Sequence, residues 1–136
     1  MVTTIVLVRG TTMTIEAAVV VDHAGRTLGW HLPPGRSSGG IPDDRDHWLF
    51  LWENRSIIGG VAHTHPWDGP ALASREDETT WAALEAALGQ RYVWPVVTFT
   101  HAAYYHWVGP EKLMYIPIDD PPWLVADIEI LRNISR

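Results

Sequence analysis

Residues 57–88 constrain the fold of this chain more than any other part of the sequence. An apolar run over residues 57–65 ends in two histidines, and a turn rich in proline and glycine follows over residues 66–73. A helical pattern then begins at Ser74 and stops before Gly89, a residue type that commonly ends helices. The order strand, loop, helix predicts an α/β fold.

The remaining pattern adds strands on both sides of this unit and two more helices. We expect strands over residues 2–9, 14–21, 27–32, 57–65, 93–100, 102–109 and 112–118, and helices over residues 43–56, 74–88 and 123–134. Periodicity does not separate a helix from a buried strand over residues 43–56, but two acidic residues at its start favour a helix. In the last helix, Leu124, Ile128 and Leu131 are predicted to share one face.

Length and composition fit one domain over residues 1–136, with a mixed sheet flanked by helices. The chain has 136 residues, 46% of them hydrophobic, which is enough for one core. The absence of cysteine excludes disulfides and thiolate metal ligands. The net charge of −6, with no cluster of lysine or arginine, gives no support for a nucleic-acid groove.

The compartment expected from the sequence is the cytoplasm. The first ten residues lack the basic segment and the cleavage site of a signal peptide, and no apolar run reaches the length of a membrane span. We therefore expect neither a membrane nor a nucleic acid as partner. The sequence leaves the oligomeric state open.

The histidine pair at the end of the strand over residues 57–65 has metal-ligand spacing. Side chains alternate between the faces of a strand, so His63 and His65 point the same way and their imidazoles can reach one point. A third ligand would complete a metal site. Two polar residues near a strand end explain the same short pattern without a metal.

Asp77 is the candidate third ligand because it heads the apolar stripe of the following helix. It shares that stripe with Trp81, Leu84 and Leu88. A carboxylate on a buried stripe needs a partner, and a metal would supply one. A helix cap formed by Ser74 and Asp77 is the alternative explanation. Three other acids of the helix fall outside the stripe and are predicted to face solvent: Glu76, Glu78 and Glu85.

Two imidazoles and one carboxylate leave the fourth position of a tetrahedral zinc open, which is typical of a catalytic zinc. Such a site needs a nearby general base. Glu16, in an apolar strand, and Glu53, at the end of a predicted helix, are the candidates, and we favour Glu16. An ordinary exposed strand residue is the alternative interpretation of Glu16.

These residues resemble the motif of the JAMM (MPN+) zinc metalloproteases. The chain is similar to a small, prokaryotic-type member of that family. The motif is an upstream Glu, then His-x-His-Pro, then Ser-x-x-Asp, here Glu16, His63, His65, Ser74 and Asp77. The resemblance covers the chain from about residue 16 to residue 88. The loop between the second histidine and the serine has eight residues, where the family pattern has seven. Only one strand is predicted before Glu16, where many members carry a helix.

The resemblance implies a cytidine-deaminase-like fold and one catalytic Zn²⁺ held by His63, His65 and Asp77. It implies that Glu16 activates water and that Ser74 stabilises the oxyanion. The implied reaction is hydrolysis of a peptide or isopeptide bond in a protein or peptide partner, with the C-terminal tail of a ubiquitin-like protein as a candidate. Two alternatives stay open: a zinc-containing MPN-fold binding module without proteolysis, and a RadC-like protein of non-peptidase function.

Three further features have an open role. The glycine- and proline-rich segment over residues 33–42 is a candidate loop beside which an extended substrate could bind. Trp67 could line a substrate channel or pack its own loop, and the sequence favours neither. His101 and His106 could form a second metal pair, although ordinary histidines on or near the surface are the favoured interpretation.

Overall fold

Six strands form one mixed sheet in the computed structural model, which describes residues 14–110 and 114–136. The strands are β1 (Ala18–Asp22), β2 (Thr27–His31), β3 (Ile58–Thr64), β4 (Trp94–Val97), β5 (Ala102–Trp107) and β6 (Tyr115–Pro117). Their order across the sheet is β2-β1-β3-β4-β5-β6. β3 and β4 run parallel, and every other neighbouring pair is antiparallel.

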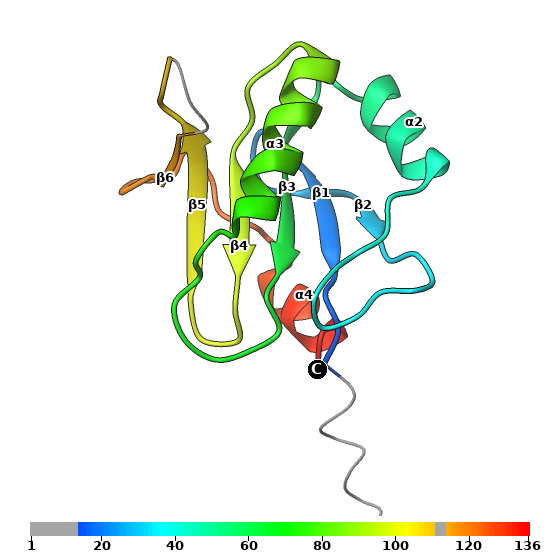
Figure 1. The fold of residues 1–136 in the computed structure, drawn as a ribbon, viewed down its shortest axis with the longest axis vertical. Helices are drawn as coiled ribbons and strands as arrows, with labels where there is room; N and C mark the ends of the chain where they lie inside the picture. The colour runs from blue at the N-terminus through cyan, green and yellow to red at the C-terminus, as the bar shows by residue number, and fades with distance from the viewer. Residues whose placement is uncertain (1–13, 111–113) are drawn as a thin grey trace, which may run out of the picture.

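Helices cover both faces of this sheet (Figure 1). They are α2 (Arg45–Glu53), α3 (Arg75–Leu88) and α4 (Ile128–Ile134). The expected α/β class, a mixed sheet flanked by helices, is confirmed for the described residues. No helix in this part of the chain combines the length and apolar character needed to cross a membrane.

The alternation of side chains along β1 separates two hydrophobic clusters. Val20 packs on one face with Leu51 of α2 and Trp81 of α3. Val19 packs on the other face with Leu131 of α4. Because successive strand residues point to opposite faces, one apolar strand supplies the core of both layers.

The ambiguous segment over residues 43–56 contains a helix, as predicted. Asp44 caps α2, since its side chain accepts a hydrogen bond from the backbone N–H of His47 at 2.7 Å. This cap satisfies one of the free N–H groups at the helix start. Leu51 is buried, whereas Trp48 and Trp52 are 37% and 42% exposed.

Strand boundaries differ from the sequence prediction where the backbone bonds to a loop instead of a strand. The predicted strand over residues 14–21 begins only at Ala18, so Glu16 precedes it. The backbone of Glu16 is held by the loop over residues 33–42: its N–H donates to the Ser37 carbonyl, and its carbonyl accepts from Arg36. The predicted strand over residues 2–9 and the first two residues of the one over 112–118 lie outside the described residues.

The predicted helix over residues 123–134 is shorter, because α4 begins at Ile128. The residues before it are held by other elements. The Val125 N–H donates to the Tyr104 hydroxyl at 2.8 Å, and the Ala126 N–H donates to the Gly25 carbonyl at 2.9 Å. Leu124 is 65% exposed and does not share the buried face of Leu131, so that part of the prediction was wrong.

Glu85 was predicted to face solvent, and this was wrong: the residue is 3% exposed. It lies one turn after Trp81 and so shares the buried face of α3. Its carboxylate accepts hydrogen bonds from three side chains and one backbone N–H, those of Tyr115, Trp94, Arg91 and Tyr92. Burial and the Glu85 carboxylate raise the pKa of Tyr115, which keeps this hydroxyl a donor.

Replacing Glu85 with alanine should lower the free energy of unfolding by about 3 kcal/mol, because buried donors would lose their acceptor. Urea unfolding followed by circular dichroism measures the change. Glu78→Ala on the same helix is the control and should change stability by less than about 0.5 kcal/mol. Equal losses in the two variants would show that the Glu85 network contributes no special stability.

Candidate metal centre

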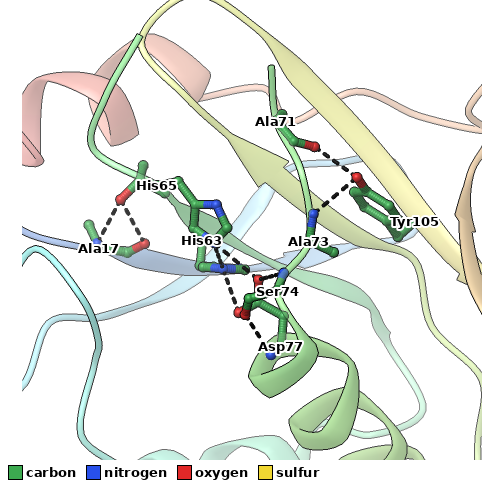
Figure 2. Close-up of polar contacts among 9 residues, drawn as sticks. Ala17, His63, His65, Ala71, Ala73, Ser74, Asp77 and Tyr105 are labelled. Carbon is green, nitrogen blue, oxygen red and sulfur yellow. Dashed lines mark hydrogen bonds and ion pairs between the residues drawn. The ribbon is translucent and has the colours of Figure 1, made fainter. Parts of the chain in front are cut away.

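Three side chains meet between the end of β3 and the start of α3 (Figure 2). Nε2 of His63 lies 3.1 Å from Oδ1 of Asp77, and Nε2 of His65 lies 3.0 Å from Oδ2. The two Nε2 atoms are 3.2 Å apart. The structure therefore brings together the three residues that the sequence predicted as metal ligands.

β3 places both histidines on the sheet face that α3 covers. His63 lies within the strand, level with Ala18 of β1 and Val96 of β4. His65 follows the strand, and its backbone N–H donates to the Val97 carbonyl at 2.9 Å. Thr64, between them, is buried on the opposite face. The strand alternation that the spacing predicted is thus present in the structure.

The loop over residues 66–73 leads from the histidines to α3 and is held along its length. The Tyr105 hydroxyl donates to the Ala71 carbonyl at 2.8 Å and accepts from the Ala73 N–H at 3.1 Å (Figure 2). Gly69 adopts a φ of 112°, which favours glycine, and its N–H donates to the Thr100 hydroxyl. This eight-residue loop still brings α3 to the histidines.

The start of α3 is capped by two of the candidate site residues. The Ser74 hydroxyl oxygen accepts from the Asp77 N–H at 3.0 Å, and the Ser74 N–H donates to Oδ2 of Asp77 at 2.9 Å. The cap and the contact with the histidines coexist because Asp77 has two oxygens with several lone pairs. The Ser74 hydroxyl hydrogen stays available, since the cap uses only its oxygen as an acceptor.

The site holds negative charge at Asp77. Burial pushes the pKa of Asp77 upward, but hydrogen bonds with His63 and His65 outweigh burial and hold that pKa well below its usual range. The carboxylate is therefore ionised at neutral pH. Burial raises the pKa of Glu16, an effect that both histidines partly offset.

The geometry fits a divalent metal ion. Ligands about 2.0–2.1 Å from a tetrahedral zinc lie about 3.3 Å from one another, and the three observed separations are 3.0–3.2 Å. In a metal-bound form, each neutral imidazole would present the lone pair of its Nε2 atom to the ion, and Asp77 would present a carboxylate oxygen. Within residues 14–110 and 114–136, His63, His65 and Asp77 are the one group with this arrangement.

The two ring nitrogens of His65 have different surroundings, since only Nε2 faces Asp77. Its Nδ1 is buried and has no hydrogen-bond partner among the described residues. Metal-bound histidines commonly donate this second ring N–H to an acceptor. Here the Trp67 ring lies 4.8 Å from the His65 ring, at an interplanar angle of 31°. Trp67 thus packs on one of the candidate ligands and lines the adjoining cavity.

A cavity of about 430 Å³ adjoins the three ligands, a size suited to a small ligand or a side chain. Glu16 and Ser74 both line it, so all five residues predicted for the site share one cavity. Glu16 is 8% exposed, which excludes the alternative of an exposed strand residue. Glu53, the other candidate base, is exposed at the end of α2 and does not line the cavity.

Two histidines that no sequence pattern indicated also line this cavity. His31, at the end of β2, stacks on His47 of α2 with ring centroids 3.6 Å apart. Burial and the neighbouring His31 lower the pKa of His47 to about 4, and burial also lowers the pKa of His31. Neither residue has a local pattern, because β2 and α2 meet only in the tertiary structure. His101 and His106 do not join a metal-binding group among the described residues.

Comparison with known protein families finds no family whose model matches this chain. Comparison with curated proteins likewise finds none that matches it.

Removing the Asp77 carboxylate should abolish metal binding. We expect wild-type protein offered Zn²⁺ to retain about one ion per chain, and Asp77→Ala to retain none, as measured by mass spectrometry of the metal content. Asp77→Ala also breaks the helix cap that Asp77 forms with Ser74, so Ser74→Ala is the control. This variant loses the cap, at a cost of about 1 kcal/mol, but keeps all three ligands and should retain zinc. If the wild type binds no zinc, Ser74 and Asp77 form only a helix cap.

Proposed function

We propose that this protein is a JAMM-type (MPN+) zinc hydrolase with a cytidine-deaminase-like fold that cleaves a peptide or isopeptide bond. The observation that carries the proposal is the convergence of His63, His65 and Asp77 on the wall of a cavity that also contains a buried glutamate. This set offers three metal ligands and leaves a position for water or substrate.

Each residue has a role that follows from its position. Bound zinc would supply a water with a pKa of about 7 and would polarise the substrate carbonyl. Glu16 takes a proton from the attacking water and later delivers it to the leaving amine. Burial raises the pKa of Glu16, which suits a residue that must both accept and donate a proton. The Ser74 hydroxyl donates to the oxygen on which negative charge develops.

The proposed substrate is a protein or peptide, and the tail of a ubiquitin-like protein remains the candidate that the family resemblance implies. No lysine or arginine is among the described residues that line the cavity. Binding of a phosphate backbone depends on such residues. The charge of the cavity therefore favours a peptide substrate over a nucleic-acid substrate. A nucleic-acid substrate would belong to the non-peptidase alternative.

Glu16→Gln should keep zinc and lose hydrolysis by a factor of at least about 100, because the amide cannot accept the proton. Metal analysis and cleavage of fusions carrying a ubiquitin-like tail measure the two properties. Glu53→Gln is the matched control and should cleave at the wild-type rate. An active Glu16→Gln would remove Glu16 from this role. A zinc-loaded wild type that binds the tail but forms no product would favour the binding module.

Two variants separate the catalytic role of Ser74 from its cap. Glycine is nearly as good an N-cap as serine but has no hydroxyl, so Ser74→Gly should stay folded and lose about 100-fold in kcat. Ser74→Thr keeps a hydroxyl and should recover most of the rate. Unfolding curves show whether the cap survives, and steady-state kinetics measure kcat. Full activity in Ser74→Gly would assign Ser74 to the cap alone.

A further inference from the structure

We propose that the cavity beside the metal centre selects substrates with a positively charged aliphatic side chain, of the lysine or arginine type, next to the bond that is cleaved. This inference rests on the proposed function, since it names the substrate class of the same site. Three features carry it: an excess of acids in the cavity, the absence of a basic side chain from its described lining, and an apolar floor that continues from the metal ligands.

Acidic side chains from several elements line the cavity. They are Glu16, Asp43, Glu76 and Asp77. A divalent metal ion would balance the charge on Asp77 and any charge on Glu16, whose pKa burial raises. Asp43 and Glu76 then remain, and both are exposed residues at the cavity. Two negative charges are thus left for the substrate to meet.

The two remaining acids come from different segments of the chain. Glu76 is in the first turn of α3, close enough to Glu16 to act on it electrostatically. Asp43 precedes α2 and acts in the same way on His31 and His47. Because these two histidine rings have lowered pKa values, they are neutral at pH 7 and do not offset the acids. A cation in the cavity would therefore meet a negative field to which both acids contribute.

Basic residues nearby are directed elsewhere. Arg36 donates to the Glu16 carbonyl at 3.1 Å and is not one of the lining residues. Arg75 precedes Glu76 in sequence but is exposed and does not line the cavity. A substrate carboxylate placed in the cavity would therefore find no described cationic side chain on its walls. This charge distribution opposes a terminal carboxylate, which a carboxypeptidase must bind.

The floor of the cavity suits the aliphatic part of such a side chain. The rings of Trp81 and Trp94 stack 5.7 Å apart at an interplanar angle of 12°, and Val61 and Leu84 also line the cavity. Trp81 is edge-on to the ring of His63, with centroids 6.4 Å apart, so this floor begins at a metal ligand. Methylene groups can pack on the apolar side chains of the lining while the charged end reaches an acid.

Hydroxamates that anchor on zinc test this preference without any cleavage. The full-length zinc-loaded protein is titrated at low salt with the Nα-acetylated hydroxamates of lysine, norleucine and glutamate, and calorimetry measures each Kd. We expect the lysine compound to bind about tenfold tighter than the norleucine compound, and the glutamate compound to bind weakest. Added salt should reduce the difference, because Asp43 and Glu76 are exposed.

Substitutions locate the origin of the preference. Asp43→Asn and Glu76→Gln should each reduce the lysine preference, and the double variant should bring the ratio of the two Kd values close to one. Glu78→Gln, in the same first turn of α3 but outside the cavity, is the matched control and should keep the full preference. All three substitutions replace an acid with its amide, so the shape of each side chain is retained.

The outcomes separate this inference from the proposed function. Protein that takes up no zinc overturns the proposed function, and the substrate class with it. Protein that binds zinc and shows no preference, or prefers the glutamate compound, overturns the substrate class alone. A lysine preference that survives in the double variant would also overturn it, because the preference would not arise from Asp43 and Glu76.

Discussion

The carboxylate of Asp77 is the interaction on which the rest of the site depends. It closes the cap of α3 with Ser74 and faces the imidazoles of His63 and His65. A helix start and a strand end are thereby tied at one point, which sets the direction of α3 over the sheet. Loss of this carboxylate would leave the buried imidazole of His65 facing the half-buried imidazole of His63, because no other described acid completes their group.

The parallel pairing of β3 and β4 explains why the site lies where it does. In α/β sheets, the space beyond the carboxyl end of a strand and beside the following helix start is open to ligands. His63 and His65 occupy the end of β3, and Ser74 begins α3. Tyr105 of β5 holds the connecting loop, so the geometry of the site depends on a strand distant in sequence.

Three acidic residues illustrate how the local environment sets the hydrogen bonding and the pKa of a carboxylate. Glu85 is buried among donors and supports the core. Asp77 is held ionised by two imidazoles. Glu16 is buried, and burial raises its pKa. The residues next to Glu85 in sequence gave no sign that it is buried, and it was predicted to be an exposed acid.

The sequence by itself determined the α/β class and the convergence of His63, His65 and Asp77, because local periodicity decides which side chains share a face. Periodicity left the segment over residues 43–56 ambiguous, and the acidic residues at its start indicated the helix found there. Only the tertiary structure decided the burial of Glu85, the late start of α4 and the stacked histidines of the cavity wall. Each of these depends on contacts between segments distant along the chain. Such contacts supply hydrogen-bond partners and packing surfaces that a local sequence pattern cannot predict.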